Sequence, residues 1–128
     1  AKISSFKLEK KELEVFEKLS VNIEYEVFED ELYDLLIGVA IYDAERNYIF
    51  GPNTYLDKYD IFSKKGFYKI KYEIPKIPLT AGTYFLDVGI FVNKGIVNLD
   101  YHQNIESFII KSDYFTEGRV FIEHNWKQ

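Results

Sequence analysis

Cysteine is absent from the 128-residue sequence, so neither a disulfide framework nor a thiolate metal site can form. A reducing compartment suits this composition but is not required by it. The opening residues 1–5 lack the apolar run of a signal peptide, and no stretch is long and apolar enough to span a bilayer. Since position 1 is Ala and not Met, we expect a processed chain or a fragment of a longer protein.

Basic clusters are missing as well. The 16 Lys and Arg residues are outnumbered by 21 Asp and Glu residues, which gives a net charge of -5 at pH 7. Such a surface repels a nucleic-acid backbone, so we predict no nucleic-acid partner. The same repulsion disfavours a polyanionic ligand.

Motifs for catalysis and cofactors are equally scarce. No Gly-x-x-x-x-Gly-Lys-Ser/Thr sequence is present, so the chain cannot hydrolyse ATP through a P-loop. Carboxylates are plentiful but show no pairing that would indicate acid-base chemistry on a glycoside. The two imidazoles, His102 and His124, lie near Asp100 and Glu123 without the spacing of a metal motif. We therefore predict no enzyme activity, no metal and no cofactor.

Aromatic residues are abundant instead: the chain has 11 Tyr and 11 Phe, more than a core of this size needs. The clearest strand pattern spans 82–92, where five side chains recur with a period of two and so share one face: Tyr84, Leu86, Val88, Ile90 and Val92. The Gly-x-Tyr sequence at its start resembles the tyrosine corner of immunoglobulin-like sandwiches. It predicts that the Tyr84 ring is buried and that its hydroxyl bonds to nearby backbone.

Similar patterns, separated by turn residues, run through the rest of the chain. We expect strands over 3–8, 19–28, 32–42, 48–50, 67–74, 82–92, 96–101, 105–110 and 119–126. Their short spacing, with only a weak helical period over 10–19, predicts an all-β fold: an immunoglobulin-like antiparallel β-sandwich of about eight or nine strands. The inner faces should form one core from Val21, Ile23, Val39, Ile41, Tyr84, Leu86, Val88 and Ile90.

Length and the absence of an internal boundary predict one domain over residues 1–128. Within it, 1–18 is a lead-in strand and connection, and 119–128 is a terminal strand. The polar segment 113–118 is hinge-like, so the terminal strand can pair with its own sheet or exchange with a second copy. The apolar residues of that strand that share one phase are Val120, Ile122 and Trp126.

The order of five segments resembles one known family. They are Leu36–Asp43, Ile49–Thr54, Ala81–Ile90, Glu106–Ile110 and Gly118–Trp126. Together they are similar to the C-terminal carbohydrate-binding domain of the nucleotide-binding subunit of O-antigen polysaccharide ABC transporters, the Wzt type. The resemblance covers residues 20–126.

The resemblance implies a non-catalytic domain that recognises a polysaccharide of O-antigen type during lipopolysaccharide biosynthesis and export. It also implies a homodimer that exchanges its last strand. The ATPase would lie in a part of the parent protein outside this chain, and through that parent the domain would meet the transporter's membrane subunit. Its location would be cytoplasmic, peripheral to the inner membrane. The alternative is an immunoglobulin-like interaction or dimerisation module without glycan binding, because exposed aromatic residues suit either role.

The outer face of the two long strands is the candidate ligand site. Its small residues, Gly38, Ala40 and Gly89, leave either a groove floor or a place where a neighbouring segment packs closely. A groove with rigid aromatic walls and a few polar groups suits a sugar, which presents C–H faces and hydroxyls together. The candidate carbohydrate contacts are Tyr42, Phe85, Asp87, Phe91, Asp100 and His102. Trp126 is expected to anchor the terminal strand.

Overall fold

The computed structural model describes all of residues 1–128, which form eight β-strands and one short 3-10 turn without any α-helix. No element of the structure is an apolar helix long enough to cross a membrane. The elements are β1 (Lys2–Leu8), β2 (Glu12–Glu14), β3 (Leu19–Glu31), β4 (Leu36–Asp43), β5 (Tyr48–Phe50), β6 (Lys64–Ile74), β7 (Gly82–Val92), η1 (Asn93–Gly95) and β8 (Val97–Lys111).

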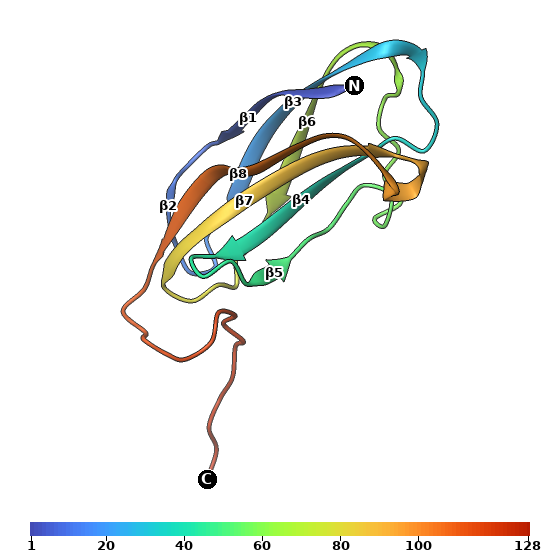
Figure 1. Cartoon of the computed structure of the whole chain (residues 1–128). Coiled ribbons are helices and arrows are strands. Elements are labelled where there is room, and N and C mark those ends of the chain that lie inside the picture. Colours follow the sequence, from blue (N-terminus) through green and yellow to red (C-terminus); the bar gives the residue numbers. More distant parts are fainter.

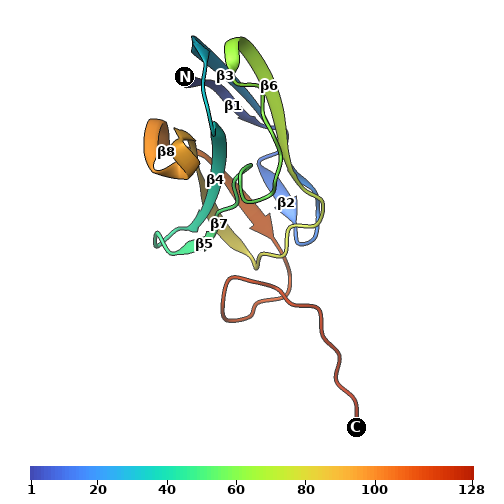
Figure 2. The same cartoon turned by 90° about the vertical axis from the view of Figure 1, so that its right-hand side faces the viewer.

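The strands form two sheets that face each other. One sheet has three strands in the order β1-β3-β6, and the other has five in the order β2-β8-β7-β4-β5 (Figure 1). The view turned by 90° shows the two layers side by side (Figure 2). All pairs are antiparallel except the short pairing of β2 with β8, which is parallel. The predicted all-β sandwich is therefore confirmed.

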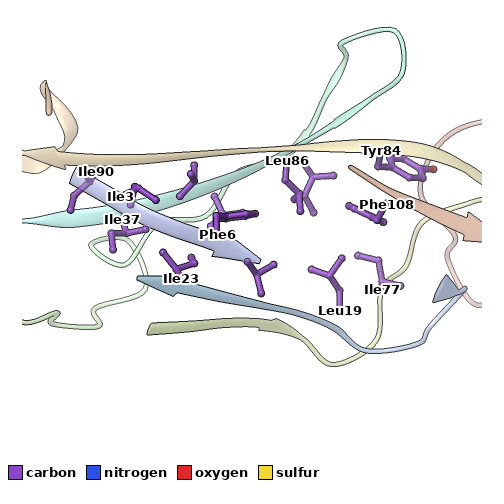
Figure 3. Packing of buried hydrophobic residues seen from close by; sticks show 14 of the residues in the cluster. Ile3, Phe6, Leu19, Ile23, Ile37, Ile77, Tyr84, Leu86, Ile90 and Phe108 are labelled. Carbon is purple, nitrogen blue, oxygen red and sulfur yellow. The ribbon is translucent and has the colours of Figure 1, made fainter. Parts of the chain in front are cut away.

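The space between the sheets holds one cluster of 19 buried apolar residues. All eight predicted core residues belong to it. Register explains the match: Val39 lies opposite Val88 and Ile41 opposite Leu86, so the inward phases of β4 and β7 coincide. Figure 3 shows Leu86 and Ile90 pointing from β7 toward Ile23 and Leu19 of the facing sheet.

The predicted tyrosine corner is present at the start of β7. The Tyr84 hydroxyl donates a hydrogen bond of 2.7 Å to the backbone oxygen of Thr80, four residues earlier. The Tyr84 ring is buried and stacks on Phe108 of β8, with 5.5 Å between the ring centroids (Figure 3). This hydrogen bond holds the connection between β6 and β7 against the start of β7.

Two separate strands were expected over 96–101 and 105–110, and this is wrong. One continuous strand, β8, spans both segments. The chain takes four steps from His102 to Glu106 where β7 takes two, from Val88 to Leu86, so the extra residues form a bulge in the ladder. Asn104 within it has a φ of 52°, in the left-handed region that Asn tolerates.

The terminal strand expected over 119–126 is not formed within this chain. Val120 makes an isolated bridge with Leu79, supported by a hydrogen bond of 2.9 Å from the Thr80 amide to the Arg119 oxygen. Beyond Phe121 the tail runs away from the body of the sandwich (Figure 1). Backbone hydrogen bonds join this segment only to the Pro78–Thr80 connection.

Candidate functional site

A groove lies on the outer face of the five-stranded sheet, over the middle of β4. Its floor is formed by Gly38, which has no side chain, and by Ala40, and these two residues alternate with the buried Ile37, Val39 and Ile41 along the strand. The hollow has a volume of about 210 Å³ and is open to solvent. Its lining residues are Leu36, Gly38, Val39, Ala40, Tyr48, Gly51, Pro52, Asn53, Asp87, Phe91, Gly95 and Tyr101.

One wall of the groove comes from β7 and β8. The rings of Phe91 and Tyr101 pack directly over Gly89. A Cβ on that glycine would lie only 2.5 Å from the Phe91 ring and 2.8 Å from the Tyr101 ring. The close-packing interpretation therefore holds for Gly89. Gly38 directly opposite is different, since a Cβ there would lie no closer than 3.5 Å to any neighbouring atom. The space above Gly38 is bordered by Asn53, Pro52 and Phe91 at ordinary contact distances, whereas the space above Gly89 is filled.

The other wall comes from β5 and the segment after it. The backbone of 52–54 runs beside β4, with hydrogen bonds of 3.2 Å from the Val39 amide to the Pro52 oxygen and 3.0 Å from the Thr54 amide to the Ile37 oxygen. The Tyr48 side chain lies directly over Gly51, in space that a Cβ would occupy. The Tyr48 ring also packs edge-on against Tyr42, at 5.1 Å between centroids.

A buried carboxylate closes one end of the groove. The Asp87 side chain is 1% exposed and follows the groove floor on the same face, opposite Ala40. Arg46 Nη2 donates to Asp87 Oδ2 over 2.6 Å, and the Tyr101 hydroxyl donates to the same oxygen over 2.5 Å. The Asn104 amide donates to Oδ1 over 2.9 Å. Three chain segments thus meet at one carboxylate.

The Arg46 guanidinium is fixed on three sides. Besides its bond to Asp87, its Nη1 donates to Asn104 Oδ1 over 2.7 Å. Its Cζ lies 3.7 Å from the centroid of the Tyr42 ring, close enough for a cation-π interaction. The guanidinium therefore covers one face of Tyr42 and forms the polar end of the groove.

The electrostatics of the cluster keep Asp87 ionised. Burial alone would raise its pKa, but the hydrogen bonds from Arg46, the Asn104 amide and Tyr101 outweigh burial and lower the pKa below its usual value. Burial, together with the adjacent Asp87 carboxylate, raises the pKa of Tyr101. Tyr101 therefore remains a neutral hydroxyl that donates to the carboxylate near neutral pH.

The outer face of the three-stranded sheet has a different chemistry. It carries pairs of opposite charge, including Lys71 of β6 with Glu9 just after β1, at 2.9 Å, and Lys69 of β6 with Glu24 of β3, at 3.7 Å. A second hollow of about 520 Å³ opens between the two sheets, beside β6 and the segment 52–57. Charged residues of β6 line it, together with Tyr72.

Comparison with known proteins shows to which family the chain belongs. The family model described as the Wzt C-terminal domain matches residues 1–122. The chain belongs to the Wzt C-terminal domain family. None of the curated proteins compared with it matches it in sequence.

Solved structures show the same fold. The crystal structure of the C-terminal domain of Wzt is similar with a TM-score of 0.83 and 14% identity, over 98% of this chain and 82% of that chain. A β-glucuronidase from Bacteroides uniformis has a TM-score of 0.56 at 16% identity, over 76% of this chain and 12% of the enzyme. Another β-glucuronidase structure from that organism has a TM-score of 0.50 at 15% identity, with the same coverage. Likeness at such identities concerns the fold alone.

This Wzt C-terminal domain brings together only some of the expected site residues. Phe91 and Asp87 line the groove. Tyr42 and Phe85 lie opposite each other on the same face, beyond the Asp87 end of the groove. The Asp87 carboxylate already accepts three hydrogen bonds from the protein.

Asp100 and His102 were expected beside these residues, but the structure places them on the opposite face of the sheet. They lie opposite Ile90 and Val88, which point into the core. Asp100 accepts a 2.8 Å hydrogen bond from the Ile3 amide at the edge of β1 and lies 3.0 Å from His102 Nε2. The phase assumed for this strand was off by one residue, which exchanges the two faces.

Sequence reasoning missed four residues of the site: Arg46, Tyr48, Tyr101 and Asn104. Tyr101 could have been found, because it lies between Asp100 and His102 and opposite Gly89. Arg46 and Asn104 carry no such signal, since a turn and a bulge in left-handed conformations place them. The structure contains no group of three or more side chains that could hold a metal, and His124 lies on the exposed tail.

Proposed function

We propose that this Wzt C-terminal domain is a non-catalytic recognition domain that binds a polysaccharide of O-antigen type for export by an ABC transporter. One observation carries the proposal: only one outer face of the sandwich has a groove with aromatic walls and fixed polar groups. The facing sheet instead presents solvated ion pairs. Aromatic rings beside a small number of positioned donors and acceptors suit the C–H faces and hydroxyls of a sugar.

The size of the groove supports contact with part of a chain. Its volume of about 210 Å³ is below the range of roughly 300–1,000 Å³ typical of sites that enclose a small molecule. An open groove buries little of a flexible, hydrated glycan, and ordering that glycan costs free energy. We expect affinity between millimolar and micromolar, about -4 to -8 kcal/mol per site.

Charge favours a neutral glycan. The chain carries a net charge of -5, which repels phosphorylated or uronic-acid chains. The one cation at the groove, Arg46, is paired with the buried Asp87 carboxylate, so this end of the site has no net charge. Hydroxyl groups match such a surface better than anionic substituents.

The tail supports a homodimer. Val120, Ile122 and Trp126 are 50%, 74% and 92% exposed, although their spacing is that of a strand with one apolar face. Exchange of this segment with a second copy would cover it and would pair its free backbone groups. Two grooves on one dimer would then gain affinity for a repeating polymer. The same exposed residues also favour the alternative, a dimerisation or protein-interaction module without glycan binding.

Family membership supports the transporter context of the proposal. The ATPase and the contact with the membrane subunit would belong to other parts of the parent protein. The domain itself would lie at the cytoplasmic side of the inner membrane, where it would bind the growing glycan without cleaving it.

An alanine series tests the function. Tyr48, Phe91 and Tyr101 line the groove, whereas Phe67 on the facing sheet is 76% exposed and is a matched aromatic control. Each variant is examined for binding to a printed array of bacterial O-polysaccharides and for its mass in solution. Loss of glycan binding in a folded protein of unchanged mass supports the groove. Loss of dimerisation with intact glycan binding would make this face an oligomer interface, and new reducing ends after incubation with a polysaccharide would indicate an enzyme.

A further inference from the structure

The Asp87 cluster at the end of the groove connects three segments that are distant in sequence. The carboxylate lies on β7, and its donors come from the turn after β4 (Arg46) and from β8 (Tyr101 and, within the bulge, Asn104). We propose that Asp87 is a positioning residue, which holds Arg46 and Tyr101 as the two polar groups that contact hydroxyls of a neutral glycan. This inference rests on the proposed function and assigns the polar contacts of that same site.

Asp87 is poorly suited to bind a ligand itself. Its side chain is 1% exposed, and both carboxylate oxygens already accept hydrogen bonds. A carboxylate offers about four lone-pair sites, and the protein fills three of them here. A sugar hydroxyl could reach the remaining site only by displacing the side chains that cover it.

Arg46 and Tyr101 have the free capacity that Asp87 lacks. The Arg46 side chain is 35% exposed, and a guanidinium has five N–H donors, of which Asp87 and Asn104 engage two. Tyr101 donates its proton to Asp87, so its hydroxyl oxygen can still accept a hydrogen bond. Donors from Arg46 beside an acceptor from Tyr101 match a sugar hydroxyl, which both accepts and donates.

The backbone around the cluster also depends on Asp87. Arg46 has a φ of 66° and Asn104 a φ of 52°, in a region that non-glycine residues seldom occupy. Each of these residues donates a hydrogen bond to Asp87. The carboxylate therefore stabilises the bulge through the Asn104 amide and orients the Arg46 guanidinium, whereas the backbone of the turn is held by Asp43.

The test uses Asp87→Asn, which keeps the size of the side chain and removes its charge. The first readout needs no ligand: nuclear magnetic resonance should show faster hydrogen exchange at the Asn104 amide and the Arg46 side chain. The second is titration with the polysaccharide that the wild-type chain binds most strongly on the array. We expect binding about tenfold weaker, the loss that follows when hydrogen bonds to a charged group are misplaced.

Controls separate this inference from general stability and from the proposed function. Tyr25→Phe removes a buried hydrogen bond to the Phe62 oxygen far from the groove and should leave binding unchanged. If Asp87→Asn does not fold, Arg46→Lys and Tyr101→Phe test the inference in its place. Each of them alters one proposed contact with the glycan and should weaken binding. Wild-type affinity in Asp87→Asn, or in both substitutes, overturns the positioning role. If Phe91→Ala also binds normally, or if the wild type binds no polysaccharide, the proposed function fails as well.

Discussion

Asp43 and Arg119 are 76 positions apart in sequence and form an ion pair, with Arg119 Nε 3.1 Å from Asp43 Oδ2. Asp43 ends β4 and begins the turn that carries Arg46, whereas Arg119 begins the tail. The same carboxylate accepts hydrogen bonds from the amide of Asn47, at 2.8 Å, and from its side chain, at 3.0 Å. One buried carboxylate thus joins the groove turn to the base of the tail.

This arrangement predicts a stability change in acid. The side chain and the amide of Asn47, helped by Arg119, lower the pKa of Asp43 to about 2 against the opposing effect of burial. Because the unfolded value is near 3.8, the ionised group stabilises the fold above pH 3.8, and its contribution is lost as the pH falls toward 2. Thermal unfolding of the wild type and Asp43→Asn from pH 5 to pH 2 should show a difference that shrinks through this window. A constant difference would contradict the prediction.

The core predicts a large cost for one truncation. Leu86 is fully buried at the centre of β7. Leu86→Ala should lower the free energy of unfolding by about 2–5 kcal/mol, through lost burial and the cavity left behind. Chemical denaturation measures this, with Thr83→Ala on the exposed part of the same strand as the control. A change under roughly 1 kcal/mol, typical of surface positions, would mean that the phase of β7 is not as described.

Two tyrosines should respond differently when their hydroxyls are removed. The Tyr84 hydroxyl donates to the Thr80 oxygen, whereas the buried Tyr72 hydroxyl has no hydrogen-bond partner in the protein. Tyr84→Phe should destabilise the fold by about 1 kcal/mol, and Tyr72→Phe should cost nothing or be stabilising. Denaturation of both variants compares them directly, and the opposite order would refute the assigned bonds.

The tail predicts a dependence of mass on its last residues. Residues 119–121 bond to the Pro78–Thr80 connection of their own chain, whereas 122–128 extend beyond it. Deleting 119–128 should yield a monomer with weakened stability. Deleting only 122–128 should also yield a monomer but retain more stability, because the Asp43–Arg119 pair remains. Sedimentation of the full chain as a monomer at high concentration would remove the dimer from the account.

Sequence patterns predicted the fold well where one face of a strand is buried. The period of two in β4 and β7 placed their inward residues correctly, because burial of one face leaves little freedom of register. The Gly-x-Tyr sequence likewise predicted that the Tyr84 hydroxyl bonds to nearby backbone, which in the structure is the Thr80 oxygen. Where burial does not decide, the predictions failed: β8 was divided in two, and the tail was assigned a strand.

The site was harder to predict than the fold. The sequence predicted a groove on this sheet face with Phe91 and Asp87 beside it, but it could not show that the Asp87 carboxylate is occupied by Arg46 and the Asn104 amide. Those partners come from a turn and a bulge, whose geometry depends on left-handed residues and not on periodic patterns. Asp100 lies on the other face because it pairs with the inward-facing Ile90, whereas its neighbour Tyr101 pairs with Gly89 on the groove face.

The central claim is that the groove over β4 binds a glycan. The most direct test is a titration of the isotope-labelled chain with a bacterial O-polysaccharide selected from the array, followed by nuclear magnetic resonance of the backbone amides. The account predicts shifts confined to the outer face of the five-stranded sheet, at 36–40, 48–53, 87–91 and 101–104. Shifts along β6 and the hollow between the sheets, or on the charged face of the three-stranded sheet, would contradict it.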